Sequence, residues 1–140
     1  LFILTVATLL TCCGTDNKTK MTDQEAQDDF DRQYAESMKD PLFALDIDSV
    51  KSEYGDRFME LRTIINHHDP ISLLDIGAPE DEYESEVKTI IVQLEDDMTQ
   101  QKVHDLIYQE FLRWFGDEST TGPKKSYKEL AIDIHEWMKK

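Results

Sequence analysis

Residues 99–115 read TQQKVHDLIYQEFLRWF, and this stretch carries the clearest folding signal in the chain. Its apolar side chains recur at intervals of three and four residues, which places them on one face of a helix. They are Val103, Leu106, Ile107, Phe111, Trp114 and Phe115. Thr99 stands where an N-cap residue is expected, and Gly116 follows where helices commonly end. The stretch predicts an amphipathic helix that buries one face against other helices.

Other segments of the chain show helical patterns as well. They cover residues 22–39, 47–65, 70–76, 85–95 and 127–138. Asp69 and Pro70 are typical of an N-cap and a first helical residue, and Ser126 with Glu129 forms a capping-box pattern. Gly55 lies inside the second segment and weakens a helix that we otherwise expect to be continuous.

The chain of 140 residues is long enough for one ordinary domain. No segment alternates apolar and polar residues over the length of a strand, and residues 117–125 are expected to form a loop. We therefore expect an all-α fold, a small bundle of about five to six helices. The predicted organisation is a single helical domain over residues 22–140, preceded by a flexible N-terminal tether over residues 14–21.

The beginning of the chain has the character of a targeting segment. Residues 1–10 read LFILTVATLL, a run too short to span a bilayer but suited to the hydrophobic part of a signal peptide. Cys13 follows with Leu10 three residues before it, which resembles the lipobox of bacterial lipoproteins, where such a cysteine is acylated. Cys12 is the alternative acceptor. The resemblance implies a signal segment over residues 1–13 and a lipid-anchored protein of the bacterial cell envelope, on the periplasmic or the cell-surface side.

Residues 64–116 resemble a small all-helical bacterial family of unknown function. The pattern is an asparagine, an Asp-Pro pair, an acidic residue followed by tyrosine, and an acidic residue that opens an apolar helix. The matching positions are Asn66, Asp69, Pro70, Glu82, Tyr83 and Glu86. The chain departs from the pattern at His68, where a tryptophan often stands in such proteins. The resemblance implies a helical fold and carries no activity with it.

The composition is strongly acidic, with 30 acidic and 15 basic residues and a net charge of −15. This charge excludes a general nucleic-acid binder, because phosphate contacts need clustered lysine and arginine. It also disfavours contact with anionic lipids, so we expect membrane contact only through the lipid anchor. Acidic residues are densest at positions 75–97, where nine of them accompany one basic residue, Lys88.

The segment around the acidic-tyrosine pair has two interpretations. In the first, it is an exposed recognition edge that binds a protein with a basic surface. The residues of that edge are Glu80, Glu82, Tyr83, Glu84 and Glu86. In the second interpretation the pattern is structural. Asp69 then caps a helix, Tyr83 packs its ring while its hydroxyl reaches water, and Glu86 complements a helix dipole.

One arrangement of residues could support catalysis. His68, the adjacent pair His104 and Asp105, and Asp133 occur in an order used by helical phosphohydrolases. Neutral imidazole and carboxylate can bind a divalent metal and activate water, so a metal-dependent phosphohydrolase of the His-Asp type is the alternative function. The chain has no nucleophile elbow, no glycine-rich phosphate loop and no cysteine beyond residue 13. We therefore expect no catalytic activity and no cofactor.

Together, these features favour a non-catalytic acidic lipoprotein that acts through protein–protein contacts. A dense negative surface accelerates encounter with positively charged molecules. The expected partner is a protein with a basic surface, as for an inhibitor or immunity-type protein that docks onto a toxin.

Overall fold

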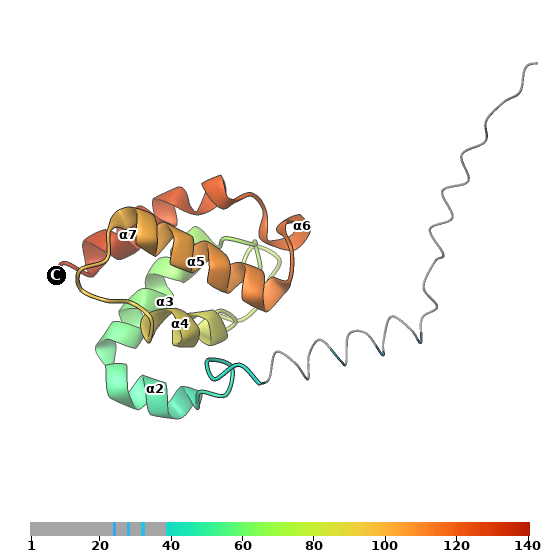
Figure 1. Cartoon of the computed structure of the whole chain (residues 1–140), viewed down its shortest axis with the longest axis horizontal. Coiled ribbons are helices and arrows are strands. Elements are labelled where there is room, and N and C mark those ends of the chain that lie inside the picture. The colour runs from blue at the N-terminus through green and yellow to red at the C-terminus, as the bar shows by residue number, and fades with distance from the viewer. Residues whose placement is uncertain (1–23, 25–27, 29–31, 33–38) are drawn as a thin grey trace, which may run out of the picture. The chain divides into compact units, whose positions relative to one another are not determined.

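The computed structural model describes residues 39–140 together with Gln24, Asp28 and Arg32 (Figure 1). The chain divides into two compact units, Leu1–Glu36 and Ser37–Lys140. In the first unit, the three described residues are helical, and the Gln24 amide donates to Asp28 Oδ1 at 2.8 Å. The predicted signal segment, Cys12, Cys13, the tether and most of the predicted helix at 22–39 lie outside the described residues.

The second unit is built from helices, and no strand occurs in residues 39–140. Its elements are α2 (Ile47–Tyr54), α3 (Asp56–His68), α4 (Glu84–Ile91), α5 (Gln100–Phe115), α6 (Glu118–Thr121), the 3-10 helix η1 (Lys124–Tyr127) and α7 (Lys128–Trp137). The predicted all-α fold is confirmed. Within the described part of the chain, each helix is too short or too polar to cross a bilayer.

Four helices form a closed ring around the core. Helix α3 packs against α4 and α7, and α5 packs against the same two helices, while α2 contacts α3 and α4 from outside the ring (Figure 1). The most deeply buried apolar side chains come from all four helices and from the segments that precede α4 and α7. They are Phe58, Leu61, Ile65, Tyr83, Val87, Ile90, Val103, Ile107, Phe111, Tyr127, Leu130, Ala131 and Ile134.

Phe111 lies at the centre of the aromatic packing. Its ring centroid is 6.0 Å from that of Tyr83, 5.1 Å from that of Tyr127 and 5.9 Å from that of Phe115. The long helix α5 begins where the sequence predicts, because Thr99 Oγ1 accepts from the Lys102 N–H at 3.3 Å. The predicted N-cap is confirmed. Phe111 faces the core because it lies four residues after Ile107 and eight after Val103, on the apolar face of the helix.

The prediction of a continuous helix over residues 47–65 is wrong, because the helix is interrupted at Gly55. Gly55 has φ +52° and ψ −124°, its N–H donates to the Lys51 carbonyl, and its carbonyl accepts from the Phe58 N–H. The residue therefore ends α2 and begins α3. Both halves keep helical spacing, so the pattern alone does not reveal that both pack against α4 while only α3 also packs against α7.

The expected short helix at residues 70–76 is also wrong, because this segment consists of turns. Asp69 does not cap a following helix. It ends α3 in the left-handed region, with φ 40° and ψ 61°, and its N–H donates to the Ile65 carbonyl at 3.0 Å. Short polar residues tolerate this backbone conformation better than most.

The predicted capping box at Ser126 and Glu129 is not formed. Ser126 lies within η1 and its hydroxyl donates to the Pro123 carbonyl at 2.7 Å, while Tyr127 occupies the N-cap position of α7. The expected loop at 117–125 contains α6 and the start of η1. The 3-10 turn satisfies the backbone locally, so the hydroxyl of Ser126 is not free to cap α7.

The break at Gly55 predicts the sign of a substitution effect. Gly55→Ala is expected to lower the free energy of unfolding by about 1–3 kcal/mol, because a side chain is strained at this backbone conformation. No atom lies within 4 Å of an added Cβ, so steric crowding does not contribute. Chemical denaturation measures the change, with Ser52→Ala inside α2 as the control. A continuous helix would instead gain about 0.5–1 kcal/mol from the same change at Gly55, and a stabilised Gly55→Ala variant contradicts the break.

Candidate functional site

The loop that joins α3 to α4 folds around the carboxylate of Asp69. Asp69 Oδ1 accepts from the Leu74 N–H at 3.2 Å and from the Tyr83 hydroxyl at 2.6 Å. Asp69 Oδ2 accepts from the Asp75 N–H at 2.9 Å. One side chain thus replaces the repeating backbone hydrogen bonds that a helix at 70–76 would have made, which is the physical reason for the turns found there.

Tyr83 connects this loop to the core. Its side chain is fully buried, so the expectation that the hydroxyl reaches water is wrong. Burial raises the pKa of Tyr83, and the hydrogen bond to Asp69 raises it further. Partial burial acts to raise the pKa of Asp69, but the hydrogen bonds from Tyr83 and from the backbone outweigh it and hold that pKa below its usual value. The pair therefore consists of a neutral phenol that donates to a carboxylate.

Glu84 holds the first residue of α4 to two other helices. Its carboxylate pairs with Arg62 of α3 at 2.8 Å and also with Lys51 of α2. The side chain of Glu84 is 11% exposed. A nearly buried carboxylate is stable here because two cations compensate its lost hydration. The side chain serves the packing of three helices and does not extend toward solvent.

An exposed acidic surface remains between these two anchors. We call Glu80, Asp81 and Glu82, all exposed, the acidic tip. The Asn66 amide of α3 donates to the Glu80 carbonyl at 2.8 Å, so the backbone of the tip is attached to a helix. Ile76 lies on the same loop and is 80% exposed. The loop thus presents carboxylates and one apolar side chain on a fixed backbone.

The predicted recognition edge is therefore narrower than the sequence suggested. Of its five residues, Glu80 and Glu82 are exposed, whereas Tyr83, Glu84 and Glu86 are buried. The buried three take part in helix packing, so they are not on the surface that a partner meets. Asp81 and Ile76 also belong to the exposed part of this loop.

Glu86 and Glu110 are buried carboxyl groups of α4 and α5. Their exposed fractions are 3% and 1%, and Glu86 Oε2 and both Glu110 oxygens have no hydrogen-bond partner among the described residues. Glu110 Oε1 lies 3.2 Å from an Arg113 nitrogen. Burial raises the pKa of Glu86 to about 7, and the carboxylates of Glu82 and Glu110 act in the same direction. Glu86 therefore does more than complement the dipole of α4.

A sequence signal for these two carboxyl groups existed. Glu86 lies three residues after Tyr83 and four before Ile90, and Glu110 lies three residues after Ile107. These spacings place both glutamates on the apolar faces of their helices. No comparable local signal exists for the pairing of Glu84 with Arg62, because these residues are far apart in the chain.

The four residues of the predicted metal site form two separate groups. His68 Nε2 lies 2.7 Å from Asp133 Oδ2, which links the end of α3 to α7. His104 Nε2 lies 2.8 Å from the Lys124 carbonyl, and Asp105 pairs with the Lys124 ammonium at 2.7 Å. In the part of the chain that the structure describes, no three His, Cys, Asp or Glu side chains gather as metal ligands would. The four residues of the alternative His-Asp metal site therefore do not form one ligand set, because η1 engages His104 and Asp105.

Searches for similar proteins add no assignment. No family model, no curated protein and no solved structure matches this chain. The resemblance of residues 64–116 to a helical family of unknown function stays a prediction.

The hydrogen bond between Tyr83 and Asp69 predicts the effect of removing one oxygen atom. Tyr83→Phe is expected to lower the free energy of unfolding by about 1–3 kcal/mol, because it leaves a charged acceptor without its shortest donor. Hydrogen exchange at the Leu74 and Asp75 amides is expected to accelerate. Tyr54→Phe is the control, since the Tyr54 hydroxyl has no hydrogen bond in the described part of the chain, and its change should stay within about 0.5 kcal/mol. Equal effects of the two variants would contradict a special role for Tyr83.

The buried carboxyl of Glu86 predicts a pH dependence of stability. Its pKa rises from 4.5 to about 7 on folding, so the native state keeps a proton that the unfolded state has released between these values. The contribution of this group to the free energy of unfolding is fully present below pH 4.5 and is lost as the pH rises through 7. Glu86→Gln removes the titrating proton, so the stability of the variant relative to wild type should increase over this range by about 3 kcal/mol.

The measurement is denaturant unfolding across this pH range for wild type, Glu86→Gln and the exposed control Glu95→Gln. The stability difference between wild type and Glu86→Gln should depend on pH, whereas the control should show a much smaller trend. Parallel curves for wild type and Glu86→Gln would show that Glu86 does not titrate in this range.

Proposed function

We propose that this chain is a non-catalytic acidic lipoprotein that acts through protein–protein contacts on a partner with a basic surface, as inhibitors and immunity-type proteins do. The observation that carries the proposal is the acidic tip. Its three carboxylates are exposed, while the residues on both sides of it are fixed by the Tyr83–Asp69 bond, by Glu84 and by Asn66.

A fixed loop favours binding for an entropic reason. A loop that is already ordered loses less conformational freedom when a partner docks than one that must be ordered in the complex. The exposed apolar side chain of Ile76, on the same loop, adds surface that a partner can bury. Carboxylates around an apolar contact also provide charge complementarity to a basic surface.

The surrounding charge supports the same kind of partner. Of the acidic residues at positions 75–97, Glu84 and Glu86 are buried, and the rest are exposed. The exposed ones are Asp75, Glu80, Asp81, Glu82, Glu95, Asp96 and Asp97. A field of this sign speeds the approach of basic proteins and repels nucleic acids.

The anchoring part of the proposal rests on the sequence of the leader. Acylation at Cys13, or at Cys12 as the alternative, would hold the helical unit at a membrane of the bacterial envelope through residues 14–21. An anchored binding protein encounters partners at that surface. This placement suits a protein that neutralises a basic toxin before it acts on the cell.

The role of the acidic tip predicts which substitutions abolish partner binding. The triple variant Glu80→Gln, Asp81→Asn, Glu82→Gln is expected to lose capture of a basic protein from an envelope extract at low and at physiological salt. The triple variant Glu53→Gln, Glu118→Gln, Glu129→Gln removes the same charge from exposed positions elsewhere and should retain capture. Quantitative mass spectrometry of the captured proteins provides the measurement. Equal loss in both variants would indicate general charge attraction, and no captured partner at either salt concentration would contradict the proposed function.

A further inference from the structure

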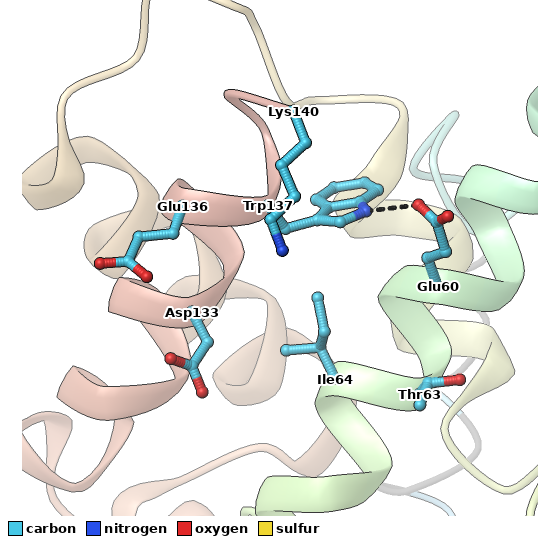
Figure 2. A pocket seen from close by; sticks show the side chains of 7 residues that line it. All are labelled: Glu60, Thr63, Ile64, Asp133, Glu136, Trp137 and Lys140. Atoms are coloured by element: carbon cyan, nitrogen blue, oxygen red, sulfur yellow. Dashed lines mark hydrogen bonds between the residues drawn. The ribbon is translucent and has the colours of Figure 1, made fainter.

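A pocket of about 540 Å³ lies between α3 and α7, on elements that do not carry the acidic tip (Figure 2). Its residues are Glu60, Thr63 and Ile64 of α3, Asp133, Glu136 and Trp137 of α7, and Lys140. Local sequence patterns do not reveal this pocket, because its two sides are more than 60 residues apart in the chain.

The apolar part of the pocket is fixed in position. The Trp137 indole N–H donates to Glu60 Oε2 at 2.7 Å, and the Arg57 guanidinium lies 4.4 Å from the centre of the indole ring. Figure 2 shows Ile64 opposite Trp137, with the indole–carboxylate hydrogen bond spanning the two helices. This arrangement leaves apolar surface at the pocket that does not need to rearrange when a side chain enters.

Carboxylates surround this apolar surface. Glu60 and Asp133 each use one oxygen, for Trp137 and His68 respectively. The Glu136 carboxylate has no hydrogen bond or ion pair in the described part of the chain, and the residue is exposed. Each of the three groups can therefore accept a further hydrogen bond from a cation.

The chain already places a cationic side chain here. Figure 2 shows the Lys140 side chain extending past Trp137 into the space that Asp133 and Ile64 border. One ammonium stands against three carboxylates, so the lining stays negative when Lys140 is present. The pocket thus accommodates an aliphatic stem with a cationic head, supplied from within the molecule.

We infer that the pocket between α3 and α7 binds a lysine or arginine side chain of a protein partner. The methylene groups of that side chain pack against Trp137 and Ile64, and its cationic head donates to Asp133 and Glu136, which lie on the same side of Trp137 (Figure 2). Lys140 competes for the same carboxylates. That the occupant belongs to a partner protein rests on the proposed function. That the occupant is a cationic side chain follows from the residues that line the pocket.

The chemistry of the pocket can be tested with small peptides and without the natural partner. The probes are blocked tripeptides with a central lysine, arginine or norleucine, of which norleucine has the aliphatic stem without the charge. The chain has two tryptophans, so its indole N–H signals report separately on Trp137 and on Trp114, which donates to Thr89. The lysine and arginine peptides should shift the Trp137 signal saturably and leave the Trp114 signal unchanged. The norleucine peptide should shift neither.

Two pairs of variants test the named groups. Glu136→Gln should weaken peptide binding by about two- to fivefold, the effect expected for a partly exposed ion pair, while Glu129→Gln on the same helix should not. Lys140→Ala should strengthen binding by a similar factor, while Lys139→Ala should not. These residues are exposed, so the fold is expected to tolerate all four changes.

The outcomes separate this inference from the proposed function. A Trp137 signal that no peptide shifts, or that norleucine shifts equally, overturns the pocket as a cation site. The same holds if Glu136→Gln and Glu129→Gln bind the peptides alike. If the peptides bind as expected but Glu136→Gln captures the natural partner as well as wild type does, the pocket is not the partner's docking site. The proposed function is judged separately, by the acidic-tip variant.

Discussion

The hydrogen bond from the Tyr83 hydroxyl to the Asp69 carboxylate joins the core of this protein to its exposed acidic loop. The Tyr83 ring is fully buried and contacts Phe111 of α5, so the packing of the helical ring fixes its position. Asp69 then fixes the backbone at Leu74 and Asp75 through two further hydrogen bonds. The shape of the loop therefore depends on the core, although most of its residues lie outside the core.

Three kinds of carboxylate occur within a short stretch around α4. Glu84 is nearly buried and pairs with Arg62 and Lys51, which compensates its lost hydration. Glu86 is buried with one oxygen unpartnered, and its pKa is raised to about 7 because the charged form is poorly solvated there. The carboxylates of the acidic tip are exposed and keep their hydration. A glutamate can thus hold helices together, lower the stability of the fold as the pH rises, or form part of a charged surface. Its burial and its hydrogen-bond or ion-pair partners decide which of these roles it has.

The two proposed contact surfaces share one physical design. The loop that carries the acidic tip and the pocket between α3 and α7 each combine carboxylates with an apolar side chain, Ile76 in the first and Trp137 in the second. Charge attracts and orients a basic partner, while the apolar side chain supplies area that is removed from water on binding. Hydrogen bonds within the protein hold the backbone of the tip and the indole of the pocket before any partner arrives.

The sequence by itself determined the helical class, the extent of α5 and its N-cap at Thr99, because these depend on side-chain spacing and on hydrogen bonds within a few residues. It placed Asp69 and Tyr83 in one pattern without revealing that they bond to each other. Tertiary structure alone decided that Gly55 separates two helices, that residues 70–76 form turns, and that His68 pairs with Asp133 rather than with His104. The turns form because the Asp69 carboxylate, which Tyr83 holds in place, accepts from the Leu74 and Asp75 N–H groups. The other two outcomes depend on how separate helices compete for the same buried volume. Local spacing contains no information about that competition.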